Sequence, residues 1–272
     1  MSEPKPGSDL STRFAAGVVM IVVASAATYF GGWAFRLLVA AGSAVMLIEW
    51  GDMHRVRRGW SWLGVALLIA ATLIISERLF PVARGDPVEI EAALFDPVWP
   101  AFGLIAVLGL LYGVVTRRPA MAWGLIYIAI PAFTLVVLNW AWFELVFWLM
   151  LVTWSTDIFA YFAGRGIGGP KLAPRTSPNK TWAGLIGGMA GAAAVGALAA
   201  WAFDLDPVFS VAGAPMGFLA QMGDLYESRV KRRLGVKDSG SILPGHGGVL
   251  DRVDGLLPVS LATLVLLLFI LA

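Results

Sequence analysis

The stretch MAWGLIYIAIPAFTLVVL at residues 121–138 contains no charged side chain. A helix that crosses the hydrocarbon core of a bilayer needs about 20 apolar residues, so this stretch predicts a membrane-spanning helix. Similar runs fill most of the chain and lack the alternating pattern of a strand barrel. We predict about nine transmembrane helices, near residues 14–31, 33–50, 60–77, 98–115, 121–138, 142–164, 182–203, 208–227 and 255–272.

The composition supports a membrane protein. Hydrophobic residues make up 58% of the 272 residues and charged residues only 14%, whereas a soluble domain carries about 25% charged residues. The polar stretch 1–12 precedes the first apolar run without a small-residue cleavage signal, which predicts a retained helix. Because the chain has no cysteine, disulfides and thiolate chemistry are excluded. The predicted fold class is an all-α, polytopic integral membrane protein.

The basic residues predict an orientation, because Lys and Arg concentrate in cytoplasmic connections. With a cytoplasmic N-terminus and nine crossings, all of the 20 Lys and Arg residues except Arg36, Arg78 and Arg84 fall on the cytoplasmic side. The opposite orientation would reverse this ratio. We therefore expect a multi-pass protein of the inner (plasma) membrane whose active site faces the cytoplasm.

Two cytoplasmic connections, 165–181 and 228–254, are long, basic and rich in Gly, Pro, Ser and Asp. Long loops in compact proteins are usually functional or disordered. We therefore divide the chain into N-terminal transmembrane helices at 1–140 and a catalytic region at 141–272. The acidic outer connection 78–97 is interpreted as a solvated spacer. No internal repeat of the kind found in many transporters is evident.

Five acidic residues lie within span six, at the end of span eight and just before span nine: Asp157, Asp224, Glu227, Asp251 and Asp254. Charges in membrane segments are costly and usually face a cavity or a partner. Carboxylates within a basic surround suit a divalent cation that serves an anionic substrate. Structural alternatives remain for two of them. Asp157 could pair with Arg165, and Glu227 could balance the basic run 229–233.

The segment GRGIGGPKLAPRTSPNKT at 164–181 has the chemistry of a phosphate-binding segment. Its glycines expose backbone N–H groups, and span seven begins directly after it, so a helix N-terminus lies nearby. The spacing is not that of a Walker loop. The alternative is a basic anchor that only sets orientation. The residues predicted to contact phosphate here are Lys171, Ser177, Lys180 and Thr181.

The segment SRVKRRLGVKDSGSILPGHGGVLDRVD at 228–254 carries the most specific pattern. It resembles the signature of the phosphatidate cytidylyltransferase (CDP-diacylglycerol synthase) family, which runs S-x-x-K-R-x4-K-D, then P-G-H-G-G, then D-R-x-D. The resemblance extends to 157–188 and to the Gly223-Asp224 step, roughly residues 150–257. One departure is Ala183, where many relatives carry Glu or Gln.

This resemblance implies a Mg²⁺-dependent reaction of CTP with phosphatidic acid that gives CDP-diacylglycerol and pyrophosphate in phospholipid biosynthesis. Some relatives use a second, monovalent ion such as K⁺. The resemblance also implies nine transmembrane helices and a homodimer in the lipid bilayer; no nucleic-acid partner is expected.

The predicted site residues fall into three sets. The residues assigned to catalysis are Asp224, Asp251, Lys237 and His246. The metal carboxylates are Asp224, Asp251, Asp254 and Asp157. Besides the segment 164–181, the phosphate contacts are Arg232, Lys237 and Arg252. Because His246 lies between glycines, we expect it to hydrogen-bond nucleotide phosphates or to stabilise the loop, in preference to transferring a proton.

Other functions stay open from the sequence. The nearest is a cytidylyltransferase for an isoprenoid-ether lipid phosphate, which shares the chemistry and differs in the lipid tail. From a different class, a membrane transporter or a non-catalytic membrane protein could carry intramembrane acids. The D-G-x2-A-R arrangement of CDP-alcohol phosphotransferases is absent.

Overall fold

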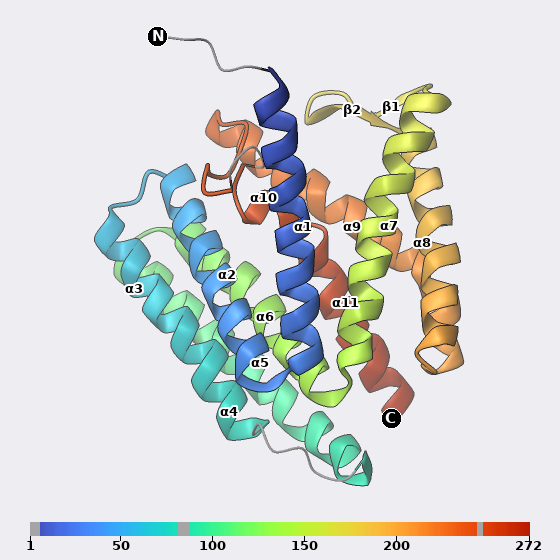
Figure 1. Cartoon of the computed structure of the whole chain (residues 1–272). Helices are drawn as coiled ribbons and strands as arrows, with labels where there is room; N and C mark the ends of the chain where they lie inside the picture. The colour runs from blue at the N-terminus through green and yellow to red at the C-terminus, as the bar shows by residue number, and fades with distance from the viewer. Residues whose placement is uncertain (1–5, 81–86, 244–246) are drawn as a thin grey trace.

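Helices form nearly all of the protein in the computed structural model (Figure 1), which describes residues 6–80, 87–243 and 247–272, with side chains for 14–80, 94, 96–243 and 247–272. The elements are, in order, α1 (Pro6–Phe30), α2 (Gly32–Met53), α3 (Arg58–Ile69), η1 (Ala70–Ile75), α4 (Ser76–Leu79), α5 (Pro87–Thr116), α6 (Pro119–Ala141), α7 (Phe143–Gly166), β1 (Lys171–Ala173), β2 (Ser177–Thr181), α8 (Trp182–Ala202), α9 (Pro207–Leu234), α10 (Leu250–Val253) and α11 (Leu256–Leu271). The π-helical η1 joins α3 to α4 without a break.

Helices cover all the predicted spans, and six stretches among the described residues are long and apolar enough to cross a membrane. These are Gly32–Met53, Arg58–Leu79, Asp96–Thr116, Pro119–Ala141, Phe143–Gly166 and Trp182–Ala202. Phe14–Phe30 and Leu256–Leu271 are apolar but shorter. The chain is therefore a helical, multi-pass membrane protein.

The connections predicted as loops are shorter and more ordered than expected. The connection 165–181 contains an antiparallel hairpin in which Lys171 pairs with Thr181 and Ala173 with Ser177, a departure from a purely helical fold. Within the outer connection 78–97, α4 reaches Leu79 and the described part from Pro87 onward is helical, because α5 begins there. Proline is favoured at the first position of a helix, where its missing N–H costs nothing. In the connection 228–254, α9 continues to Leu234 and α10 forms a further helical turn.

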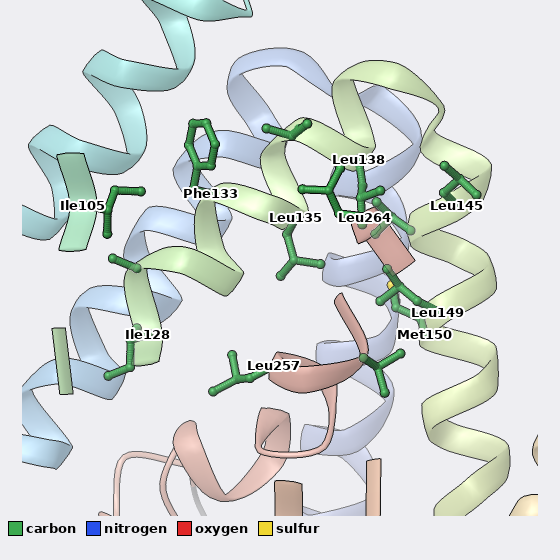
Figure 2. Close-up of a cluster of buried hydrophobic side chains, with 14 of the residues drawn as sticks. Ile105, Ile128, Phe133, Leu135, Leu138, Leu145, Leu149, Met150, Leu257 and Leu264 are labelled. Carbon is green, nitrogen blue, oxygen red and sulfur yellow. The ribbon is translucent and has the colours of Figure 1, made fainter. Parts of the chain in front are cut away.

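Helix α6, which contains the stretch 121–138, lies at the centre of the bundle. Of the six apolar stretches it is the most buried, with 72% of its most apolar window inside the protein. Figure 2 shows Ile128 and Phe133 of α6 in one hydrophobic cluster with Ile105 of α5, Leu149 of α7 and Leu264 of α11. All five side chains are fully buried. Because α6 contacts helices from both ends of the sequence, it holds the two parts of the chain together.

The polar connections gather at one end of the bundle. Figure 1 shows the hairpin, α10 and the start of α1 at this end, whereas the C-terminus and the α1–α2 turn lie at the opposite end. Helices α7 and α8 run side by side toward the hairpin and pack closely, since a Cβ added at Gly188 of α8 would lie 2.9 Å from the carbonyl oxygen of Thr156. The hairpin is thereby carried on a tightly packed helix pair.

Candidate active site

The C-terminal part of α9 supplies the first carboxylates of the site. Asp224 and Ser228 are four residues apart and share one face of the helix, and Ser228 Oγ donates a hydrogen bond to Asp224 Oδ1 (3.2 Å). Directly before Ser228, Glu227 places its Oε2 2.6 Å from Lys231 Nζ. This contact is an ion pair, and Glu227 is fully buried. The alternative in which Glu227 balances the basic run 229–233 is thus realised through Lys231.

The hairpin brings a second cation to α9. Lys180 of β2 places Nζ 2.6 Å from Asp224 Oδ2, with the two side chains 16% and 34% exposed. Lys180 Nζ also lies 3.5 Å from the carbonyl oxygen of Gln221, and Arg232 Nε donates to the carbonyl oxygen of Thr176 (3.4 Å). These contacts dock the hairpin on α9, so a residue predicted to bind phosphate lies beside one predicted to bind metal.

Thr181 has a local structural role. Its side chain is the N-cap of α8 and accepts a hydrogen bond from Gly184 N (3.0 Å). The residue is only 4% exposed. An N-cap hydroxyl satisfies one of the N–H groups left without a partner at a helix start. The hydroxyl predicted to face phosphate therefore fixes the direction in which α8 leaves the hairpin.

Asp251 is the most heavily bonded carboxylate of the site. Its Oδ1 lies 2.5 Å from Lys231 Nζ, and its Oδ2 accepts from the backbone N–H groups of Ser239 and Gly248, both at 2.9 Å. Burial opposes ionisation of Asp251, but the hydrogen bonds from Lys231 and from the two backbone groups outweigh it and lower the pKa of the carboxyl. Ser239 N also donates to Asp251 Oδ1 at 3.2 Å. Because a carboxylate offers about four lone-pair positions, these contacts occupy nearly all of them.

Asp254 lies where the chain passes closest to α9. A Cβ added at Gly223 would collide with the carbonyl oxygen of Asp254, so only glycine permits this approach. Burial and then the negative charges of Asp224 and Glu227 raise the pKa of Asp254, although Gly255 N donates to its Oδ1 at 2.7 Å. Asp157 of α7 adds to the same repulsion. The structure thus brings the predicted carboxylates within electrostatic range of one another.

The remaining predicted residues lie around this centre. Ser177 is partly buried. Four basic side chains are exposed: Lys171, Arg232, Lys237 and Arg252. Asp157 is exposed on α7 and lies within electrostatic range of Asp224, Lys180 and Arg252. The alternative partner of Asp157, Arg165, donates instead to Tyr161 Oη (2.9 Å). His246 lies outside the described residues.

Two residues of this site were not assigned from the sequence. Lys231 joins two buried carboxylates, Glu227 and Asp251. Glu49 of α2, only 3% exposed, accepts hydrogen bonds from the segment that carries Asp251. The signal for Glu49 was present, because a lone acidic residue in an apolar span is costly and usually faces a partner.

In the parts of the chain that the structure describes, no three or more His, Cys, Asp or Glu side chains form a group that could hold one metal ion. Asp224 and Asp251 are each paired with a lysine. The arrangement is therefore a set of lysine–carboxylate pairs, with Asp254 close to both α9 and Asp157 and an exposed basic rim around them.

A helical membrane bundle with lysine–carboxylate pairs at one end, edged by basic side chains, defines a class of membrane protein suited to phosphate-bearing ligands. The model of the Cytidylyltransferase family matches residues 11–270. The chain therefore belongs to the cytidylyltransferase family, whose name denotes a nucleotidyltransferase reaction.

Individual relatives agree with this assignment. The chain is 38% identical over 274 residues to the phosphatidate cytidylyltransferase of Brucella abortus biovar 1 (strain 9-941), covering 93% of this chain and 91% of the relative. It is 32% identical over 271 residues to the phosphatidate cytidylyltransferase of Pseudomonas aeruginosa, covering 94% and 97%. The similarity to that of Rickettsia bellii (strain RML369-C) is 40% over 149 residues, covering 49% and 63%. Similarity to the first two spans both the helices and the site.

Proposed function

We propose that this chain is a phosphatidate cytidylyltransferase that converts CTP and phosphatidate to CDP-diacylglycerol and pyrophosphate. The observation that carries the proposal is the 38% identity to a phosphatidate cytidylyltransferase over 93% of the chain. The names of the relatives favour this activity over an isoprenoid-ether lipid substrate and over transport. The acyl chains of phosphatidate would stay in the bilayer while its phosphate enters the polar end of the bundle.

We further propose nine membrane crossings with the N-terminus in the cytoplasm of an inner (plasma) membrane. The distribution of basic residues supports this orientation, and so does the gathering of the hairpin, α10 and the start of α1 at one end (Figure 1). The site would then face the cytoplasm, from which CTP arrives. The further proposal of a homodimer rests on the family resemblance.

The reaction needs positioning and charge neutralisation more than a strong base. A phosphate oxygen of phosphatidate attacks the α-phosphorus of CTP, a new P–O bond forms, and the bond from the α-phosphorus to the bridging oxygen breaks as pyrophosphate leaves. The attacking phosphate is already ionised near neutral pH, so alignment and charge stabilisation carry the catalysis. Lys180 lies beside the carboxylates, and the exposed side chains that would take up phosphate charge are Lys171, Arg232, Lys237 and Arg252.

The side chains of the site fit Mg²⁺ by their donor chemistry. Mg²⁺ is usually bound by one or two carboxylates together with waters and substrate phosphates, so a cage of many protein ligands is not needed. We propose that Asp224 and Asp251 hold Mg²⁺ with Asp254 and Asp157 beside them. When bound, the ion would neutralise charge on the reacting phosphates. A monovalent ion such as K⁺ is a second proposed ligand, and His246 is proposed to hydrogen-bond nucleotide phosphate.

The test is Mg²⁺-dependent pyrophosphate release by the detergent-purified protein supplied with CTP and phosphatidate. Asp224→Asn and Asp251→Asn should each lower the rate by at least about 100-fold, the upper end of the effect of losing an outer partner of a metal site. Asp52→Asn is the matched control. It makes the same change in an exposed carboxylate that pairs with Arg58 at 3.2 Å, and it should leave the rate unchanged.

The alternatives predict different results. Release with an isoprenoid-ether lipid phosphate and none with phosphatidate would change the substrate. No release by a folded wild type with any lipid phosphate would refute the proposed activity. Full activity in either Asp→Asn variant would remove that residue from the proposed metal site.

A further inference from the structure

Glu49 is a buried carboxylate that accepts three hydrogen bonds from a distant part of the chain. It sits near the end of α2 and is 3% exposed. Its Oε1 accepts from Val249 N at 2.8 Å, and its Oε2 accepts from Leu250 N at 2.9 Å and from Ser239 Oγ at 3.1 Å. An ionised carboxylate is buried without large cost only when hydrogen bonds replace its hydration. Ser239, Val249 and Leu250 therefore stabilise the buried carboxylate of Glu49, and Glu49 in turn holds these residues in place.

The two segments that contact Glu49 also hold Asp251. Ser239 gives its hydroxyl to Glu49 and its backbone N–H to Asp251 Oδ2. In the second segment, Gly248 N donates to Asp251 while the next two N–H groups donate to Glu49. Two carboxylates thus fasten the same pair of segments together. Asp251 is bonded in turn to Lys231 of α9, so Glu49 is linked to α9 through a continuous set of bonds.

The packing around Glu49 admits no larger neighbours. A Cβ added at Gly240 would lie 2.7 Å from Glu49 Oε1, and a Cβ added at Gly248 would also lie 2.7 Å from it. Real Cβ atoms do not approach this closely, so the backbone closes directly on the carboxylate. Gly248 of the signature and the nearby Gly240 thus have a physical reason in a residue some 190 positions earlier in the sequence.

We propose that Glu49 is a positioning residue for the cytidylyl transfer, holding Ser239 and residues 248–250 so that Asp251 faces Lys231 of α9. This inference rests on the proposed function. Glu49 acts through the backbone and through Ser239, and it does not touch the reacting atoms. The first helices of the bundle thereby contribute to the geometry of a site whose chemistry comes from the C-terminal half.

Replacing Glu49 by Gln keeps the size of the side chain and removes its charge. Both Glu49 oxygens accept hydrogen bonds, whereas the amide NH₂ of Gln can only donate. In the variant this NH₂ would therefore lie against a donor, and at least one hydrogen bond would be lost. We expect Glu49→Gln to lower kcat by about 10- to 100-fold, the consequence of losing one or two charge-assisted hydrogen bonds. The KM for phosphatidate should change less than about threefold, because the variant displaces the segments at Ser239 and 248–250 and leaves the rest of the site, where the lipid would bind, in place. Ser239→Ala, which removes one donor, should give a smaller loss of kcat.

The experiment combines kinetics with hydrogen exchange on the full-length protein in detergent. In Glu49→Gln, peptides that carry Ser239, Val249 and Leu250 should exchange faster than in wild type, while peptides from α6 should not change. Glu77→Gln is the control, because Glu77 pairs with buried Arg36 and lies in the other part of the first helices. It should lower thermal stability and leave kcat unchanged.

The outcomes separate positioning from general destabilisation. Unchanged exchange around residues 239–250, or a kcat loss no larger than in Glu77→Gln at matched loss of stability, would overturn the inference. If Glu49→Gln does not fold, an unaltered kcat in Ser239→Ala would overturn it as well. Absence of pyrophosphate release by the wild type would instead overturn the proposed function and the catalytic part of this inference. The exchange data would then still decide whether Glu49 holds the segment.

Discussion

Lys231→Met removes the cation that lies between two buried carboxylates, and we expect it to destabilise the protein by about 3–5 kcal/mol. The side chain of Lys231 is 11% exposed, that of Glu227 is 0% exposed and that of Asp251 is 5% exposed. The Nζ group lies 2.6 Å from one carboxylate and 2.5 Å from the other. At an effective dielectric constant of 20, each contact corresponds to an attraction of about 6 kcal/mol.

Most of this attraction offsets the loss of hydration, which costs several kcal/mol for each buried ion. In the variant the attraction is lost, while both carboxylates stay buried. The net effect is therefore large even though the intact trio contributes little. Glu227→Gln combined with Lys231→Met should recover part of the loss, because only one carboxylate then stays unpaired.

The effect should depend on pH with a definite sign. In the wild type the pKa of Asp251 is lowered, through the Lys231 and backbone hydrogen bonds that outweigh its burial. A carboxyl with a lowered pKa stabilises the fold above its unfolded pKa of about 3.9, and this contribution is lost as the pH falls. The difference between wild type and Lys231→Met should therefore be largest near pH 7 and shrink toward pH 4.

Thermal unfolding in detergent, followed by tryptophan fluorescence at several pH values, measures this difference. Arg233→Met is the matched control, because it removes an exposed basic side chain from the same end of α9 and should change stability by less than about 0.5 kcal/mol. Equal stability of Lys231→Met and wild type at pH 7 would refute the reasoning. So would a difference that grows as the pH falls.

Three further predictions follow from the same structure. Thr181→Val should cost about 1 kcal/mol of stability through loss of the helix cap, whereas Thr181→Ser should cost little in the same thermal unfolding assay. Gly223→Ala should lower stability by about 1–3 kcal/mol and also reduce pyrophosphate release, because the new Cβ would collide with the carbonyl oxygen of Asp254. Gly42→Ala should be tolerated, because a Cβ there meets no atom within 4 Å. Removal of Mg²⁺ by EDTA should weaken binding of labelled CTP to wild type more than to Asp224→Asn, and equal weakening in both proteins would argue against Asp224 as a ligand.

Much of the fold was predictable because lipid imposes a length and a polarity on each span. The run 121–138 is confirmed as a buried helix at the centre of the bundle (Figure 2). The connections were harder to predict, because hydropathy does not report hydrogen bonding. Nothing in the apolar pattern predicts that residues 171–181 fold back as a hairpin. The start of α5 at Pro87 was missed because acidic and proline residues were interpreted as spacer instead of as the first turn of a helix.

The site was predictable where one segment carries its own pattern. The segment 228–254 carries Asp251 and Asp254, and the structure sets Asp251 beside Lys231 of α9 and Asp254 within electrostatic range of Asp224. Pairings between distant segments could not be derived in the same way. Lys180 and Asp224 are 44 positions apart, and their contact depends on how the hairpin docks on α9. Glu49 is harder still, since two of its three partners are backbone N–H groups, which every residue except proline carries.

The charge distribution explains why lysines and carboxylates lie so close together in this site. Lys171 and Arg232 are exposed, whereas Lys180 and Asp224 are partly buried. Lys180 and Asp224 form an ion pair with each other in the structure. Without this pairing, Lys180 would be suited to bind an anion and Asp224 a cation. Lys180 can turn to a phosphate at low cost only if Asp224 gains another positive partner, because either ion left alone in a half-buried position loses several kcal/mol. We infer that this exchange of partners couples binding of the nucleotide to binding of a cation, so that neither is held firmly without the other.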